Sequence, residues 1–232
     1  MVGAADVGPG CEQVVDGFLR EPVSAWSSLA FVVAGVLIEV LARRRRRADS
    51  GPDGPLGAVV EPPSLAYAVA VAGIGVGSVM QHGPNPFWAD LAHDLPLLAT
   101  LALIASDAAA DLAHRAREWW WWALPTALLA PVIHWFPDAG DMAQGVVAGV
   151  AVLLNLERAR RQPALRQAIW WTVALLGFGG VLQLASRPGK PLCFPDSVWW
   201  HPHAVWHTLV AAALTILAGG LGLRRVARAD RV

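Results

Sequence analysis

Charged side chains are scarce in this 232-residue sequence, and the scarcity excludes several classes of protein. Asp, Glu, Lys and Arg make up 16% of the residues, whereas soluble domains usually contain about 25%. The basic and acidic residues balance at 18 each, so the formal net charge is zero and nothing indicates a nucleic-acid partner. With 55% hydrophobic residues, the composition is that of a membrane protein.

The N-terminal residues also lack the pattern of a cleavable signal peptide. The first twenty residues contain Asp6, Glu12 and Asp16 and lack an apolar core. We therefore expect the first hydrophobic span to serve as its own insertion signal.

Long apolar stretches dominate what is present. A bilayer core of about 30 Å needs roughly 20 apolar residues per helix, and seven stretches meet this requirement. The predicted spans are 24–42, 64–82, 90–110, 119–135, 140–156, 168–186 and 202–223. The sequence thus predicts an all-α, polytopic membrane protein, with residues 1–232 forming a single seven-helix transmembrane domain.

The arginines predict the orientation of these spans. They gather at 43–47, 115–117, 158–166 and 224–231, after alternate spans and at the C-terminus. Because cytoplasmic loops carry an excess of positive charge, this pattern places the N-terminus outside and the C-terminus in the cytoplasm.

Cysteine occurs only twice, as Cys11 and Cys193, and the predicted topology places both outside the membrane. The oxidising side of a membrane permits a disulfide bond between them. Two unrelated thiols are the alternative.

Histidines are distributed unevenly along the predicted spans. Only His114 lies on the inner side, and the other six fall at outer ends. These six are His82, His93, His134, His201, His203 and His207. A single histidine at an interface usually serves as an anchor or helix-end residue, which is our interpretation of His134 and His201.

Three of these histidines form a pattern typical of a catalytic zinc site. His203 and His207 are four residues apart, so they share one helix face and can bind the same ion. His82, at the end of the second span, is expected at the same depth. Three imidazoles with an open fourth position are the ligand set of a catalytic zinc, which activates water for hydrolysis.

Ser78 and Asp94 complete the candidate site. Ser78 lies one turn before His82 and could bind the water or an oxyanion, whereas Asp94 could accept and return a proton. Both residues have simpler interpretations. A serine in the Gly-rich second span can be a packing residue, and an aspartate at a helix N-terminus can complement the helix dipole.

Other functions remain open at this point. A seven-helix receptor or sensor with a structural zinc would show the same histidines. A haem protein would also use paired histidines, although it normally takes them from different helices. A proton-coupled transporter would place its ionisable groups near the middle of the membrane.

The motifs, taken together, resemble the alkaline ceramidase family. They are Gly77-Ser78-x-x-x-His82, an Asp near the start of the third span, His203-x-x-x-His207, and Cys11-Glu12 followed by the segment 21–31. That family belongs to a superfamily of seven-helix membrane hydrolases that includes the adiponectin and progestin receptors. The resemblance extends over nearly the whole chain.

The resemblance implies a function and roles for residues. His82, His203 and His207 would bind zinc, and Ser78 and Asp94 would position and activate the water. The reaction would be hydrolysis of the amide bond of ceramide or a related N-acyl lipid.

It also implies structural features. Cys11 and Cys193 would form the external disulfide of the family. Glu12 and Glu21 match two acidic ligands of its calcium site, although the residues between them do not match.

Two further points concern the proton-transfer group and the source. Alignment through Leu95-Pro96 sets the family's Asp opposite His93, so His93 or Asp90 could share the role of Asp94. The short inner loops and small size are typical of a bacterial member, which predicts the inner membrane as its location and a site near the outer face.

Overall fold

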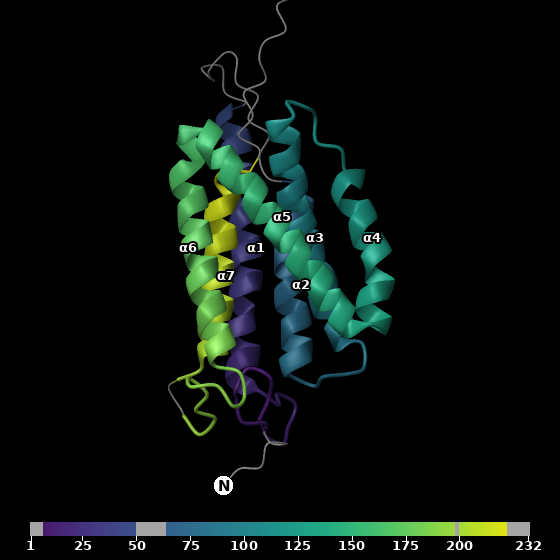
Figure 1. The fold of residues 1–232 in the computed structure, drawn as a ribbon, viewed down its shortest axis with the longest axis vertical. Coiled ribbons are helices and arrows are strands. Elements are labelled where there is room, and N and C mark those ends of the chain that lie inside the picture. Colours follow the sequence, from purple (N-terminus) through teal and green to yellow (C-terminus); the bar gives the residue numbers. More distant parts are fainter. Residues whose placement is uncertain (1–6, 50–63, 198–199, 222–232) are drawn as a thin grey trace, which may run out of the picture.

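The structure, a computed structural model, describes residues 7–49, 64–197 and 200–221, which form seven helices (Figure 1). In chain order they are α1 (Pro22–Asp49), α2 (Leu65–His82), α3 (Ala89–Leu112), α4 (Trp120–Trp135), α5 (Pro137–Arg161), α6 (Pro163–Ala185) and α7 (Pro202–Ala218). The described residues contain no β-strand, only an isolated bridge between Val7 and Gln13. The predicted all-α fold is therefore confirmed.

Five of the helices are long and apolar enough to cross a membrane: α1, α2, α3, α5 and α6. The remaining two are shorter, with 16 residues in α4 and 17 in α7. The predicted last span, 202–223, runs beyond α7 and ends among residues 222–232, which lie outside the described part. These helices are consistent with a membrane protein.

Several helices extend past the predicted spans. The first continues through the arginines to Asp49, α5 covers Pro137–Arg161 instead of 140–156, and α6 begins at Pro163 instead of 168. Hydropathy marks only the apolar part of a helix. Proline is favoured in the first turn, where its missing N–H costs nothing, and arginine is favoured in the last turn, where it complements the helix dipole.

Six helices form a closed ring, in which α1 packs on α2, α2 on α3, α3 on α5, α5 on α6, α6 on α7, and α7 back on α1. The seventh, α4, lies outside the ring against α3 and α5 (Figure 1). Small residues permit the closest approach, since a Cβ atom on Gly77 would overlap the backbone of Ala92. This contact sets the C-terminal half of α2 directly against α3.

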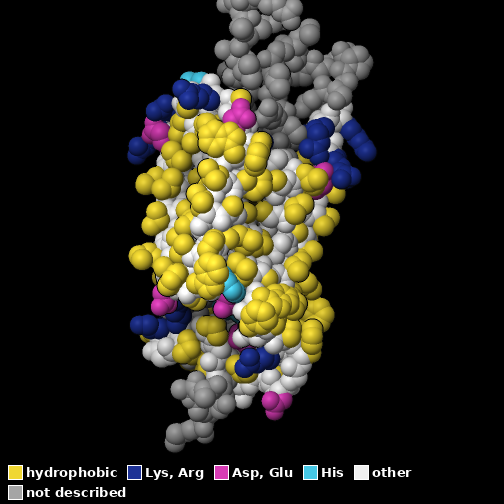
Figure 2. Space-filling view, turned by 90° about the vertical axis from the view of Figure 1, so that its right-hand side faces the viewer, with side chains coloured by type: hydrophobic (Ala, Val, Ile, Leu, Met, Phe, Trp, Pro, Cys, Tyr) yellow, Lys and Arg dark blue, Asp and Glu magenta, His cyan; other side chains and the backbone are white. Residues whose placement is uncertain are grey.

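The surface is divided into zones by side-chain type. Figure 2 shows hydrophobic side chains covering the middle of the molecule and charged side chains near its two ends. Large apolar residues such as Val33, Leu153 and Val181 are exposed on this surface. Exposed apolar area of this extent matches a lipid environment.

A buried ion network joins the helices at the end of the bundle where the arginines gather. The guanidinium of Arg158 on α5 is 1% exposed and forms salt bridges with Asp107 and Asp111 of α3. Arg117 binds the other oxygen of Asp107 at 2.9 Å, and Arg158 also donates to the backbone oxygen of Gly220. The network therefore links α3, α5 and the end of α7.

Removing the central cation of this network should destabilise the bundle strongly. In the variant Arg158→Met, Asp111 and one oxygen of Asp107 would stay buried without their partner. We expect a loss of about 3 kcal/mol in the free energy of unfolding, measured by denaturation in detergent. The matched control is Arg160→Met, because Arg160 is exposed and should change stability by less than about 1 kcal/mol. Equal losses in both variants would contradict a structural role for the network.

Candidate metal centre

Three histidines meet at the end of the ring opposite the arginines. His82 is the last residue of α2, and His203 and His207 lie one turn apart at the start of α7. Their ligand nitrogens all lie within 4.8 Å of one another. The Nε2 atoms of His82 and His203 are 3.1 Å apart. The sequence prediction that α2 and α7 bring these rings together is confirmed.

The second nitrogen of each ring is held by a polar side chain from another part of the fold. Each of these contacts involves Nδ1 and is short enough for a hydrogen bond. The pairs are His82 with Glu21 Oε2 at 2.9 Å, His203 with Gln183 Oε1 at 2.6 Å, and His207 with Ser27 Oγ at 2.8 Å.

These partners fix which nitrogen carries the hydrogen. A carboxylate and an amide oxygen only accept hydrogen bonds, so His82 and His203 must donate from Nδ1. Ser27 already donates its hydroxyl hydrogen to the backbone oxygen of Ser24, so it accepts from His207 Nδ1. When the three imidazoles are neutral, each Nε2 atom then carries a lone pair and no hydrogen.

Convergent lone pairs fit a metal ion. Two Nε2 lone pairs 3.1 Å apart cannot bond to each other, and a cation between them removes their repulsion. With metal–nitrogen bonds of about 2.0–2.1 Å, a tetrahedral site separates its nitrogens by about 3.3 Å. His82 and His207 are nearly fully buried, so water screens the cluster poorly. The residues present therefore suit a bound metal ion.

The N-terminal segment, residues 7–21, packs against this cluster, with Glu21 beside His82 and Gly10 beside His203. Glu12 accepts hydrogen bonds from the backbone N–H groups of Val23 and Ser24, at 2.6 and 2.8 Å, and so caps α1. The backbone N–H of Glu21 donates to the backbone oxygen of His82 at 2.8 Å. Glu21 therefore supports His82 through both its backbone and its side chain.

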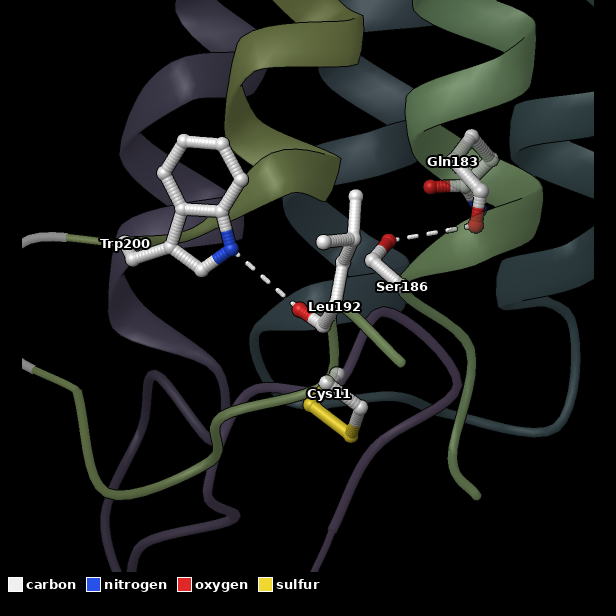
Figure 3. The surroundings of a disulfide bond; sticks show 6 residues. Cys11, Gln183, Ser186, Leu192 and Trp200 are labelled. Atoms are coloured by element: carbon white, nitrogen blue, oxygen red, sulfur yellow. Dashed lines mark hydrogen bonds between the residues drawn. A yellow bond between two sulfur atoms is a disulfide. The ribbon is translucent and has the colours of Figure 1, made fainter. Parts of the chain in front are cut away.

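A disulfide bond anchors the same segment. Cys11 and Cys193 are joined, as the sequence predicted, with their Cα atoms 5.4 Å apart. Figure 3 shows the bond joining the N-terminal segment to the loop that follows α6, in which the Trp200 indole N–H donates to the backbone oxygen of Leu192. The N-terminal segment and this loop thus form one cross-linked cap.

Ser78 lies beside the cluster, connected to it through a second serine. It is fully buried, and its Oγ is 2.7 Å from Ser28 Oγ. Ser28 Oγ is in turn 3.4 Å from His207 Nδ1. A hydroxyl chain therefore leads from Ser78 to a ligand candidate.

Asp94 pairs with its neighbour in the sequence, since its Oδ1 is 2.7 Å from His93 Nδ1. Asp90, about one turn earlier on α3, accepts a hydrogen bond from Gln81 at 2.8 Å. Both carboxylates therefore have a polar partner, and His93 and Asp94 form a hydrogen-bonded pair.

The two carboxylates expected at a calcium site have other partners. Glu12 caps α1 and Glu21 binds His82. Within the described ranges, His82, His203 and His207 are the only group of three or more ligand side chains close enough to share an ion. Calcium binding by Glu12 and Glu21 stays a prediction without support from their contacts.

Sequence reasoning missed the residues that orient the imidazoles. Ser27 and Gln183 were not assigned roles, and Glu21 was assigned to calcium. A signal was present, because Gln183 is a polar residue near the C-terminal end of the apolar helix α6, and Ser24, Ser27 and Ser28 lie in the first two turns of α1. Buried polar groups in such positions require partners.

Gly10 should set the position of His203. A Cβ atom on this glycine would lie 2.7 Å from Cγ and 2.8 Å from Cβ of His203, so Gly10→Ala must displace the ring. We expect metal affinity to fall by about 10- to 100-fold, measured by titration with Zn²⁺ or Co²⁺. Gly177→Ala is the matched control, because nothing lies within 4 Å of its added Cβ atom. Unchanged affinity in Gly10→Ala would show that the cap does not position the ligand.

No family model matches the sequence, and no curated protein matches it. The resemblance to alkaline ceramidases stays a prediction, and function has to be inferred from the geometry of the three histidines and their partners.

Proposed function

We propose that the protein is a membrane-embedded zinc hydrolase that cleaves the amide bond of an N-acyl lipid similar to ceramide. One observation carries the proposal: three imidazoles, each held at Nδ1, bring their ligand nitrogens within 4.8 Å of one another, and the Nε2 atoms of His82 and His203 are 3.1 Å apart. Structural zinc sites are closed by four protein ligands, whereas three ligands leave a position for water or substrate.

The ligand set supports zinc over haem. Two axial histidines on one haem iron stand on opposite sides of it, which separates their nitrogens by about 4 Å for bonds of about 2 Å. The Nε2 atoms of His82 and His203 are 3.1 Å apart, which is closer to the nitrogen–nitrogen distance of a tetrahedral site, about 3.3 Å. When bound, zinc would polarise the amide carbonyl and make water a stronger nucleophile.

The remaining residues would manage protons and orientation. His93, held by Asp94 at 2.7 Å, can take a proton at Nε2 while Asp94 stabilises the resulting imidazolium. The same nitrogen can then return the proton to the leaving amine. Ser78 would orient the reacting group through its hydroxyl and its link to Ser28.

An apolar cavity supports a lipid substrate. It has a volume of about 350 Å³ and lies between α3, α5, α6 and α7. Trp206, which lines it, directly precedes His207, and Val210, Leu214 and Leu217 continue the wall along α7. This cavity would hold the acyl chain with its amide end at the metal centre.

The location in the membrane is part of the proposal. The arginine-rich ends of α1 and α5 would face the cytoplasm, and the disulfide-linked cap would face outside. All seven helices would span the bilayer of a bacterial inner membrane. The substrate would then reach the site at the outer leaflet.

His203→Ala tests the proposal directly. The variant should lose zinc and hydrolysis together, because Nε2 of His203 is one of only three ligands. Wild-type protein should contain about one zinc ion per chain and release fatty acid from ceramide in detergent micelles. The matched control is His134→Ala, which removes an exposed histidine of α4 and should change neither property. Hydrolysis that persists in His203→Ala after removal of metal would refute the ligand assignment.

Asp94→Asn separates metal binding from proton transfer. Asparagine keeps the size of the side chain but cannot stabilise a charged His93. We expect zinc content to stay at the wild-type level and kcat to fall by about 10²–10⁴-fold. The control is Asp90→Asn, whose carboxylate binds Gln81. An unimpaired Asp94→Asn enzyme, or a larger loss in Asp90→Asn, would assign the proton transfer elsewhere.

A further inference from the structure

The cavity between α3, α5, α6 and α7 has the dimensions of one hydrocarbon chain. Its lining extends from Gln144 to Asn155 on α5 and from Trp206 to Leu217 on α7. Each interval is eleven residues, which corresponds to about 16 Å along a helix. A volume of about 350 Å³ over this length gives a mean cross-section of about 22 Å², close to that of a single extended alkyl chain. The cavity therefore has room for one chain that lies along the helices.

One end of the cavity adjoins the candidate metal centre. Trp206, which lines this end, directly precedes His207 on α7. Its indole packs on α6, where a Cβ atom on Gly179 would lie 2.6 Å from an indole carbon. The glycine thus permits a close contact that holds the indole in place. Trp206 therefore fixes the level at which a chain enters the cavity.

Packed side chains close the other end. One turn beyond Asn155, the side chain of Arg158 is 1% exposed and donates to the backbone oxygen of Gly220 at 3.3 Å. This hydrogen bond joins α5 to the residues that follow α7. Leu165 and Leu221, at the same end of the bundle, are 2% and 3% exposed. A chain that reaches Asn155 has no space to continue.

The lining makes the fit of a chain depend on its length. Apolar side chains such as Ile104, Val173 and Leu214 form most of the wall. A chain that fills the space gains dispersion contacts with them, whereas a short chain leaves part of the wall without contacts. A chain longer than the space must displace packed side chains or bend out of the cavity.

We propose that the cavity selects acyl chains by length, with a limit at about fourteen carbons. Successive carbons of an extended chain advance about 1.3 Å, so 16 Å holds about twelve of them. The carbonyl carbon and its neighbour lie outside, at the metal centre. This inference rests on the proposed function, in that the chain belongs to the lipid whose amide bond is cleaved, and it narrows the substrate class to lipids with acyl chains of medium length.

Binding of free fatty acids tests the inference without hydrolysis. The probes are saturated acids with eight to eighteen carbons, which compete with a fluorescent fatty acid on the full-length protein in detergent. Partition of each acid into micelles, measured without protein, gives its concentration in water. Affinity for the acid in water should rise about fourfold per methylene up to about fourteen carbons, and longer acids should gain nothing further.

Two variants should move the limit in opposite directions. Leu217→Ala removes three carbons at the closed end and should extend the rise in affinity by about two carbons. Ala151→Leu fills the cavity about 10 Å from Gln144 and should end the rise at about ten carbons. The matched control is Val150→Leu, because Val150 is 45% exposed and does not line the cavity, so the wild-type limit should be kept.

Several results would overturn the inference. They are a rise in affinity that continues to eighteen carbons, a rise that ends at ten carbons or fewer in the wild type, a limit that is the same in Leu217→Ala and Ala151→Leu, or no binding of any acid. The wild-type series decides even if a variant does not fold. Failure of the proposed function gives a different result, because a protein without zinc or hydrolysis can still show a length limit.

Discussion

A neutral imidazole has one N–H group and one lone pair, so a hydrogen bond that fixes the first nitrogen decides what the second can do. At the end of this bundle opposite the arginines an acceptor meets Nδ1 of each of three rings, and the acceptors come from α1, from α6 and from the segment before α1. The Nε2 lone pairs are thereby left free to act as ligands. What the cluster can bind follows from partners that hold the opposite side of each ring.

The same constraint explains the construction of the cap. Glu21 must approach His82 closely. Because a Cβ atom on residue 8 would overlap the carboxylate of Glu21, this position requires glycine. Glu12 holds the start of α1, and the bond between Cys11 and Cys193 holds the turn against the loop before α7. The cap therefore fixes the positions of the imidazoles and also covers them.

The helices and the three histidines could be predicted from sequence because both produce regular spacing. Apolar runs indicate helices, and the interval between His203 and His207 is one helical turn. Spacing says less about contacts between helices. It did not show that α4 lies outside the ring, or that Ser27 and Gln183 meet the imidazoles, because both depend on how helices rotate about their axes when they pack.

The three candidate ligands are divided between the second helix and the seventh, and this division bears on the order in which such a site can assemble. His203 follows His82 by 121 residues, so a ribosome delivers the helices α3 to α6 between the two ligands. A chain made only as far as α6 has one of the three imidazoles. Any metal ion held by all three would therefore have to be loaded after α7 has been made and has packed on α1.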